Sequence, residues 1–372
     1  MKVALLSGGA SIHTIRWANG LAQAGHQVHL ITQHPLLEPV DASVVLHEFP
    51  YRGTLGYFLM ASSVKKLLKK IKPDVLNAHY ASGYGTTARL INFHPYLLSV
   101  WGSDVYDVPN QSKFHRYWIK TNLQSADRIA STSHCMATQT HTLADNLGDI
   151  AITPFGVDVE RFEYRQSVAV NKDALVIGTI KRLAPKYGID TLIESFALLL
   201  SHYRKKSPEI AEKLELHIVG EGPQREELEL LAKRLDVDQQ TRFFGRVLHF
   251  EVPKKLAEFD IYAALSRLDS ESFGVAIIEA GAAGKPVVVS DAGGLPEVVV
   301  AEKTGIVVPR AQPQQAAKAL QRLIEDPSLR SSMGQEGYKH VKSQYSWSLS
   351  VLTMQKLLED VVQDGAQVNE LA

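Results

Sequence analysis

The stretch "LVIGTIKRLAPKYGIDTLIESFALLL", Leu175 to Leu200, decides the fold of this chain. Its first six residues are mostly apolar or β-branched, which is typical of a buried strand, and the segment after Gly188 has the spacing of an amphipathic helix. A basic loop joins the two. Strand, short loop and helix in this order form the repeating unit of a parallel sheet covered by helices.

The same alternation fills the rest of the chain. Strand-like segments before residue 155 are "KVALLS", "VHLIT", "DVLNAH", "YLLSV", "RIAST" and "IAITPFG", and those after residue 174 are "LVIGTI", "LELHIV", "TRFFG", "DIYAALS", "PVVVS" and "GIVVP". The rhythm breaks at residues 155–174, which are charged and without a clear period. The length of 372 residues also exceeds one ordinary core. We predict an α/β protein with two doubly wound domains, at 1–160 and 172–345, and a last helix at 346–372 that packs on one of them.

Composition excludes several classes of protein. The 40 basic and 40 acidic side chains cancel, so no global field would draw the chain to nucleic acid. Cys135 is the only cysteine, which rules out an internal disulfide and favours a reducing cytoplasm. The first apolar run, Val3 to Leu6, is too short for a secretory signal, and no stretch approaches the length of a membrane span. We expect a cytoplasmic protein, either free or at the inner face of a membrane.

Open parallel sheets bind ligands beyond the carboxyl ends of their strands, so we expect two facing lips with a cleft between them. Gly8 and Gly9 follow the first strand, where their backbone could approach an anion; a tight strand-to-helix turn explains them equally well.

Lys181, Arg182 and Lys186 follow the first strand of the second domain. A guanidinium and an ammonium suit a diphosphate, and a solvated basic loop is the alternative.

The segment "DSESFGVAIIEAGAAGKPVVVS", Asp269 to Ser290, keeps two acids, Glu271 and Glu279, in apolar surroundings. A helix beginning at Phe273 or Gly274 and ending near Ala283 would leave first-turn amides free for an anion. Glu271 would precede this helix and Glu279 would lie in its second turn. A buried charge needs a hydrogen-bonding partner, and ribose hydroxyl groups would serve Glu279.

These motifs together resemble the retaining glycosyltransferases of family 4, which have the GT-B fold. The resemblance rests on "ESFGVAIIE", "KRLAPKYGIDTLIESF", "IVGEGPQREEL", "DAGGLPEVV" and "TGIVVP", and it is dense from Val176 to Pro309. It implies transfer of a sugar from a nucleotide sugar, with uridine as the commonest base, and a tail helix that returns to the first domain. The co-substrate takes the place of a cofactor.

The resemblance also implies roles for individual residues. Arg182 and Lys186, with Lys181 beside them, would hold the pyrophosphate, and Gly9 would approach it from the first domain. Glu271 would bind hydroxyl groups of the donor sugar, and Glu279 would bind the ribose. The remaining donor-binding residues would be Gly222, Arg246, Val247, Ser272, Phe273, Gly274 and Val275.

Two positions depart from the family pattern. Many relatives read R-L-x-x-x-K-G, but Tyr187 stands at the lysine position here and Lys186 precedes it. Trp101 stands where many relatives have a histidine before Gly-Ser-Asp. We expect His13, His79, Trp101 and Asp104 to contact the acceptor, with His79 and Asp104 orienting its hydroxyl group. A cap acid at Asp104 and a satisfied histidine at His79 are the structural alternatives.

No cluster with metal-ligand spacing stands out, so we expect metal-independent transfer. Five lysines, Lys65, Lys66, Lys69, Lys70 and Lys72, lie beside apolar residues and could contact an anionic membrane surface; a solvated helix face is the alternative. The predicted function is transfer of a hexosyl group to a glycan, lipid-linked or lipopolysaccharide-type acceptor in cell-surface polysaccharide synthesis. The resemblance favours a UDP-sugar as the donor, because uridine is the commonest base in that family. The alternatives are a sugar-nucleotide epimerase, an enzyme that forms small glycosides or glycolipids, and a two-domain sugar-binding protein.

Overall fold

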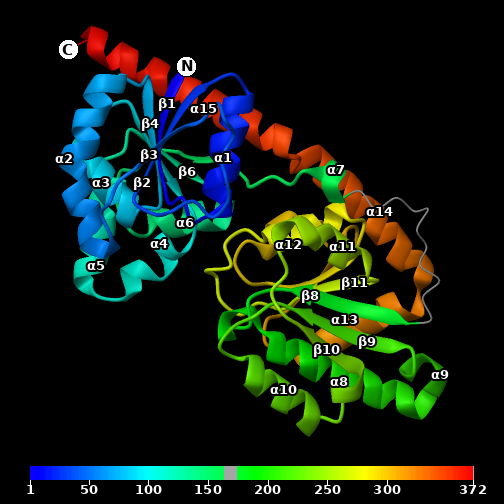
Figure 1. The fold of residues 1–372 in the computed structure, drawn as a ribbon. Coiled ribbons are helices and arrows are strands. Elements are labelled where there is room, and N and C mark those ends of the chain that lie inside the picture. The colour runs from blue at the N-terminus through cyan, green and yellow to red at the C-terminus, as the bar shows by residue number, and fades with distance from the viewer. Residues whose placement is uncertain (163–173, 372) are drawn as a thin grey trace. The chain divides into compact units, whose positions relative to one another are not determined.

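The computed structural model describes residues 1–162 and 174–371, and these form two compact units. The first unit contains Met1–Pro154 and Ser348–Ala372, and the second contains Phe155–Trp347. Each unit is a parallel sheet with helices on both faces (Figure 1). The prediction of two doubly wound α/β domains is therefore confirmed.

The first domain is built on seven parallel strands. They are β1 (Lys2–Leu6), β2 (Gln27–Thr32), β3 (Val45–Glu48), β4 (Val75–His79), β5 (Tyr96–Val100), β6 (Arg128–Ser131) and β7 (Ile150–Ile152). Their spatial order is β3-β2-β1-β4-β5-β6-β7. The central strands β1, β4 and β5 are almost wholly buried because helices cover both faces, and this explains their continuous apolar sequences.

Helices and short turns connect these strands. The connections are α1 (Ile12–Gln23), α2 (Gly53–Ile71), α3 (Gly83–Ile91), α4 (Ser103–Tyr106), η1 (Val108–Asn110), α5 (Lys113–Leu123) and α6 (His134–His141). The long α15 (Trp347–Leu371) comes from the other end of the chain. It is fixed to this domain by an ion pair between Asp364 and Arg128 and by the contact of Gly365 with Pro95.

The second domain has six parallel strands. They are β8 (Leu175–Ile180), β9 (Leu214–Val219), β10 (Thr241–Phe244), β11 (Ile261–Ala264), β12 (Val287–Ser290) and β13 (Gly305–Val308). Their spatial order is β10-β9-β8-β11-β12-β13. Both sheets thus place their first strand beside their fourth. At this switch point the crossover helices diverge to opposite faces, which opens a ligand site at the carboxyl ends of the two strands.

The helices of the second domain complete its two outer layers. They are α7 (Val159–Phe162), α8 (Ile189–Lys206), α9 (Pro208–Ala211), α10 (Arg225–Arg234), α11 (Val252–Ala257), α12 (Val275–Ala282), α13 (Pro313–Glu325) and α14 (Pro327–Gln344), with 3-10 turns η2 (Pro185–Tyr187), η3 (Asp238–Gln240), η4 (His249–Glu251) and η5 (Leu295–Val298). One core cluster joins β8, β9, α8 and α13.

The boundary of the first domain differs from the predicted residue 160. Residues 155–162 belong to the second domain, where α7 packs against α12 and Val157 hydrogen-bonds to Tyr345 and Trp347. The charged residues of this segment indicated a linker, but Phe155, Val159 and Phe162 are buried. The rest of the expected linker, residues 163–172, lies outside the described residues.

Candidate active site

The switch point of the second sheet carries the charged groups of the candidate site. Lys181 and Arg182 directly follow β8, and the loop that contains Glu271 leads from the neighbouring strand β11 to α12. Because both strands end at the same edge of the sheet, residues about 90 positions apart in the chain meet here. The sequence-predicted cations and the first acid are thus brought together.

Lys181 and Glu271 form a buried ion pair. Lys181 Nζ donates to Glu271 Oε1 at 2.5 Å, and the two side chains are only 8% and 11% exposed. Burial acts to lower the pKa of Lys181, but the negative charge of Glu271 outweighs it and the pKa is raised. Lys181 is therefore charged at neutral pH, and its charge is directed at Glu271.

The two other predicted cations are arranged differently. Lys186 Nζ donates to the carbonyl oxygen of Ser270 at 3.2 Å and lies 5.1 Å from the ring centre of Tyr187. Arg182 is exposed, and among residues 1–162 and 174–371 its guanidinium has no hydrogen bond or ion pair. Of these three cations, Arg182 is thus the one whose charged group is left available to a ligand.

A pocket of 680 Å³ opens at the ends of β8 and β9. Several predicted donor-binding residues line it together: Lys181, Arg182, Gly222, Arg246 and Val247. The glycine turn after β9 is sterically required, since a Cβ on Gly220 or Gly222 would collide with the carbonyl oxygen of Lys181 or Leu183. These glycines let two strand exits approach each other and form the wall of the pocket.

Helix α12 begins at Val275, with Gly274 as its N-cap in the left-handed region at φ +95°. Within the part of the chain that the structure describes, the amide N–H groups of Phe273, Gly274 and Val275 donate no hydrogen bond. Ser272 and Phe273 are buried, and the Phe273 ring packs against Phe155 and Tyr345. Free amides at a helix N-terminus are the arrangement that the predicted anion site requires, and anion binding there stays a prediction.

Glu279 is buried in α12, and its partner is a residue that sequence reasoning missed. His249 Nε2 lies 3.1 Å from Glu279 Oε1, and Glu279 is 7% exposed. His249 belongs to the turn η4 that follows Arg246 and Val247. A histidine next to two predicted ligand residues was the available signal, but thirty positions separate it from Glu279 and no periodicity relates them.

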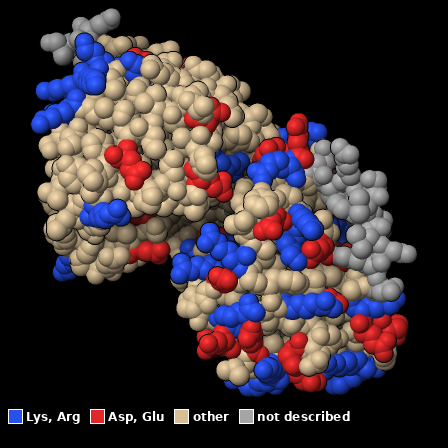
Figure 2. Space-filling view, in the orientation of Figure 1, with Lys and Arg blue, Asp and Glu red and all other residues tan. Residues whose placement is uncertain are grey.

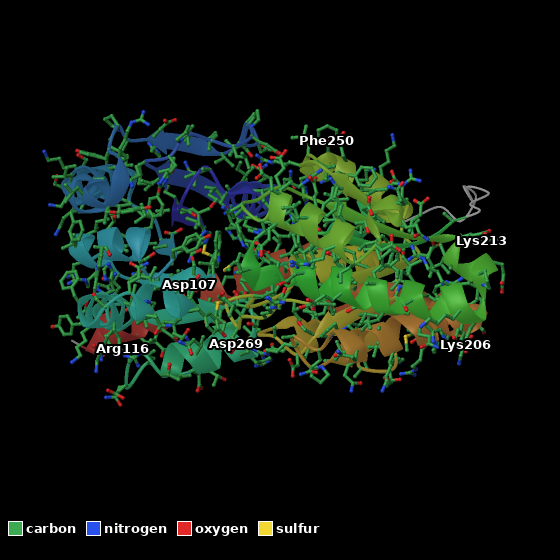
Figure 3. All side chains as sticks on the ribbon, turned by 90° about the horizontal axis from the view of Figure 1, so that it is seen from below. Asp107, Arg116, Lys206, Lys213, Phe250 and Asp269 are labelled. Atoms are coloured by element: carbon green, nitrogen blue, oxygen red, sulfur yellow. The ribbon has the colours of Figure 1, made fainter. Side chains whose placement is uncertain are left out.

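Backbone contacts from the next strand exit hold the Glu271 loop. Gly294 N donates to the carbonyl oxygen of Glu271 at 3.1 Å, and Gly293 N donates to Asp269 Oδ1 at 3.1 Å. A Cβ on either glycine would clash with this loop. Arg310 binds both Asp269 at 2.8 Å and Asp291 at 3.0 Å, so it ties together the loops after β11, β12 and β13. Figure 3 labels Asp269 in this loop.

At the switch point of the first sheet, the N–H group of Gly9 is already occupied, and the approach of Gly9 to a pyrophosphate stays a prediction. Its N–H already donates to Thr32 Oγ1 at 3.0 Å, so it is not available to a phosphate. A Cβ there would lie 2.8 Å from the carbonyl oxygen of His34. The glycine is therefore needed for the close approach of the segment after β2.

His79 lies at the end of β4 and is completely buried. Its Nδ1 is 2.8 Å from Ser7 Oγ and its Nε2 is 3.0 Å from Asn77 Oδ1. Burial, followed by the charge of His13, lowers the pKa of His79 to about 3. With both ring nitrogens occupied and no access to solvent, His79 is a neutral structural histidine, and this geometry contradicts direct contact with an acceptor.

Asp104 is also fully buried and also structural. Its carboxylate accepts backbone N–H groups from Ala81 at 2.7 Å, Gly102 at 2.8 Å and Trp101 at 3.2 Å. Burial raises the pKa of Asp104, and these hydrogen bonds oppose the shift. Asp104 therefore fixes the loops after β4 and β5 and does not reach an acceptor itself.

The side chains of His13 and Trp101 are partly exposed at the same switch point. The centre of the Trp101 ring lies 4.1 Å from the centre of the His79 ring, 5.1 Å from that of Tyr80 and 6.1 Å from that of His13. All four residues predicted to contact the acceptor thus lie at this switch point, but only His13 and Trp101 are accessible to solvent.

The described residues contain no group of three or more His, Cys, Asp or Glu side chains that could hold a metal ion. No described helix combines the length and the hydropathy that a membrane span requires.

Comparison with protein families gives two matches, in separate parts of the chain. Residues 2–133 match the model "Glycosyl transferase 4-like", and residues 160–340 match the model "Glycosyl transferases group 1". The second match contains every residue of the site on the second sheet, and the first contains the switch point of the first sheet.

Two relatives differ in how much of this chain they match. The chain is 33% identical over 210 residues to the GDP-mannose-dependent monoacylated alpha-(1-6)-phosphatidylinositol monomannoside mannosyltransferase of Corynebacterium glutamicum, which covers 53% of this chain and 52% of that enzyme. It is 25% identical over 384 residues to the N-acetyl-alpha-D-glucosaminyl L-malate synthase of Bacillus anthracis, covering 96% of this chain and 95% of that enzyme. The first match spans only about half of the relative and the second nearly all of it.

Among solved structures, sucrose-phosphate synthase from Thermosynechococcus elongatus is similar over 98% of this chain and 100% of its own, with a TM-score of 0.83 and 19% identity. At this identity the likeness concerns the fold. It extends through both domains.

Proposed function

This chain belongs to the family 4 type of glycosyltransferases with the GT-B fold, and from that premise we propose that it moves a hexosyl group from a UDP-sugar to a hydroxyl group of an acceptor. The acceptor is a glycan, a lipid-linked sugar or a lipopolysaccharide-type molecule of cell-surface polysaccharide synthesis. One observation supports the proposal above others. The 680 Å³ pocket has the exposed Arg182 in its wall, and its volume falls in the range of small-ligand sites.

The proposed reaction retains the configuration at the anomeric carbon and uses no metal. The acceptor oxygen forms a bond to that carbon on the face from which the diphosphate leaves, the bond from the carbon to the phosphate oxygen breaks, and the acceptor proton moves to a phosphate oxygen. Arg182 and the free amides at the start of α12 would stabilise the charge of the leaving diphosphate. Because the leaving group takes the proton, neither His79 nor Asp104 is needed as a base.

Two relatives support alternatives for donor and acceptor. The Corynebacterium mannosyltransferase is GDP-mannose-dependent by name, which favours a guanosine donor as the second candidate. The Bacillus anthracis enzyme is a malate glycoside synthase by name, which favours a small-molecule acceptor.

The direct test is incubation with UDP-glucose, UDP-galactose, UDP-N-acetylglucosamine and GDP-mannose, followed by measurement of free UDP and GDP. A transferase releases nucleotide slowly from its own donor and faster when acceptor is added. An epimerase would release UDP together with a C2-inverted sugar, and a sugar-binding protein would release nothing. Either of the last two results would refute the proposal.

We also propose that the first domain contacts an anionic membrane surface, where a lipid-linked acceptor would be found. The sequences of α2 and α5 contain no Asp or Glu. Leu55 and Leu59 of α2 are 74% and 60% exposed, and Phe114 and Tyr117 of α5 are 68% and 67% exposed. The ring of Phe58 lies 5.5 Å from that of Trp118, which joins the two helices into one apolar surface.

Basic residues border this surface. Lys65, Lys66, Lys69 and Lys70 continue the exposed side of α2, and Figure 2 shows Lys and Arg side chains gathered where α2 ends, at the upper left. Arg116 lies at the outer edge of α5 (Figure 3). Each basic residue near an anionic surface contributes about 1 kcal/mol, and the exposed apolar side chains would enter the interface.

Sedimentation with phosphatidylglycerol vesicles tests this contact. Reversal of Lys66, Lys69 and Lys70 to Glu should reduce the bound fraction at least about tenfold. Reversal of Lys205, Lys206 and Lys213 in the second domain is the matched control and should leave binding unchanged; Figure 3 labels two of these residues. Equal binding by both variants would refute the membrane contact but would not affect nucleotide release from the donor.

A further inference from the structure

We propose that Lys181 is a positioning residue for Glu271 and not a ligand of the diphosphate, so that it acts on the sugar half of the donor. This inference rests on the proposed function and assigns a role within its site. It separates the three cations that the sequence groups together.

The position of Lys181 supports this assignment. It directly follows β8, next to the strand that leads into the Glu271 loop, and its ammonium group is 2.5 Å from Glu271 Oε1. Both side chains are almost inaccessible to water. A buried ammonium group must keep its partner, because an unpaired charge in such surroundings is strongly destabilising. Turning Lys181 toward a phosphate would leave the Glu271 carboxylate buried without a partner.

Tyr187 explains how two ammonium groups can lie side by side. Its ring centre is 5.4 Å from Lys181 Nζ and 5.1 Å from Lys186 Nζ, so each cation approaches the same aromatic ring. Lys186 then binds the carbonyl oxygen of Ser270, and Lys181 binds the carboxylate of the next residue. The two lysines therefore hold consecutive residues of one loop.

The backbone of that loop has separate support. Gly294 N holds the carbonyl oxygen of Glu271, and Arg310 holds the side chain of Asp269. Removal of the Lys181 ammonium group should therefore leave the loop in place and release only the carboxylate of Glu271. Arg182, whose guanidinium is exposed, remains the cation for the diphosphate.

Nucleoside diphosphate binding separates the two roles, because UDP has the diphosphate but lacks the sugar that is transferred. Lys181→Met should keep the Kd for UDP within about twofold of the wild type and lower kcat for transfer about 100-fold, the typical loss when a contacting group is misplaced. Arg182→Ala is the matched variant and should weaken UDP itself. If the wild type turns over GDP-mannose instead, GDP takes the place of UDP in these measurements.

A double variant tests whether Lys181 acts through Glu271. Once Glu271→Gln has removed the carboxylate, the further change Lys181→Met should alter kcat less than about twofold, because neighbouring groups that act as a unit are not additive. The double variant also leaves no unpaired buried charge, so it keeps the inference testable if Lys181→Met alone fails to fold. Lys181→Arg should recover part of the activity.

Two results would overturn the inference: a loss of UDP affinity in Lys181→Met as large as in Arg182→Ala, or multiplicative losses in the double variant. Failure of the proposed function looks different, since the wild type would then transfer no sugar from any donor.

Discussion

The two sheets place the same kind of switch point at the same place in their strand order but fill it with different chemistry. In the first domain, Ser7 and His79 hydrogen-bond to each other, Asp104 accepts backbone N–H groups, and all three residues are completely buried. In the second domain, the corresponding strand exits carry Lys181, Arg182 and Glu271 beside an open pocket. Polar residues at a strand exit can thus build either the scaffold of a site or the site itself.

Burial and hydrogen bonding distinguish the two cases. A polar atom that already has its partners inside the protein has no bond to offer to a ligand. In the first domain this is true of His79, Asp104 and the amide of Gly9. In the second domain the guanidinium of Arg182 and the first amides of α12 remain available. The comparison predicts that variants at the first switch point reduce stability and variants at the second reduce activity.

The largest expected effect concerns Arg182. Arg182→Ala should lower kcat/KM for transfer about 100- to 1,000-fold, the usual loss when one preorganised group that stabilises transition-state charge is removed. The melting temperature should not change, because the side chain is exposed and has no internal hydrogen bond among the described residues.

Arg204→Ala is the control for Arg182→Ala. Arg204 is an exposed arginine of the same domain that pairs with Asp236, and its removal should leave kcat/KM unchanged. Normal transfer by Arg182→Ala would place the diphosphate elsewhere. Glu271→Ala is less informative than Glu271→Gln, because it leaves the buried charge of Lys181 without a partner.

The next effect concerns Asp104. Asp104→Asn should lower the free energy of unfolding by about 3 kcal/mol. The carboxylate accepts hydrogen bonds from three backbone N–H groups, and the NH₂ group of asparagine cannot accept any of them. Urea unfolding followed by circular dichroism measures this loss. A variant with unchanged stability but greatly reduced kcat would instead give Asp104 a role in the reaction.

A smaller effect should appear as pH dependence of stability. The pKa of His79 in the folded protein is about 3, below the ordinary value of 6.5. As the pH falls, the imidazole of the unfolded chain therefore takes up its proton at a higher pH than that of the folded protein. Stability should therefore be constant above pH 6.5 and fall as the pH decreases below it, by about 2 kcal/mol at pH 5 from this group.

His79→Gln isolates this contribution, because glutamine can form hydrogen bonds but does not titrate in this range. Urea unfolding at pH 7 and pH 5 should show a smaller loss in the variant than in the wild type. Equal losses in both proteins would mean that His79 takes up a proton in the folded state, contrary to the buried and neutral histidine described above.

The smallest expected effect is that of a chelator. Arg182 and the helix amides would stabilise the leaving diphosphate without a metal ion. The rate of transfer in about 5 mM EDTA should therefore equal the rate without EDTA. The comparison is with the same protein after addition of excess Mg²⁺. A loss of activity that Mg²⁺ restores would show that Arg182 and the amides of α12 are not sufficient.

Much of the fold and the second switch point could be predicted from the sequence. Apolar strands followed by basic or glycine-rich loops show where strands end, and the order of strands in a parallel sheet brings their exits together. Lys181, Arg182, Glu271 and the amides of α12 could be placed in this way, because each lies within a few positions of a recognisable strand or helix end.

The partners of those residues could not be predicted in the same way. Lys181 and Glu271 are 90 positions apart, and His249 and Glu279 are 30 positions apart, so neither pair leaves a local pattern. Burial was the second gap. His79 and Trp101 both follow strands, yet one is enclosed and the other partly exposed, because the loops that cover them come from distant segments.

The assignment of α15 to the first domain has a consequence for synthesis on the ribosome. The second domain is one uninterrupted segment, Phe155–Trp347, and all of it is translated before the residues of α15 that close the first domain. The first domain is translated earlier but lacks its closing helix until Ser348 and the residues after it emerge. The half of the protein that is made first is therefore completed last, and a premature stop near residue 347 would damage it and spare the other.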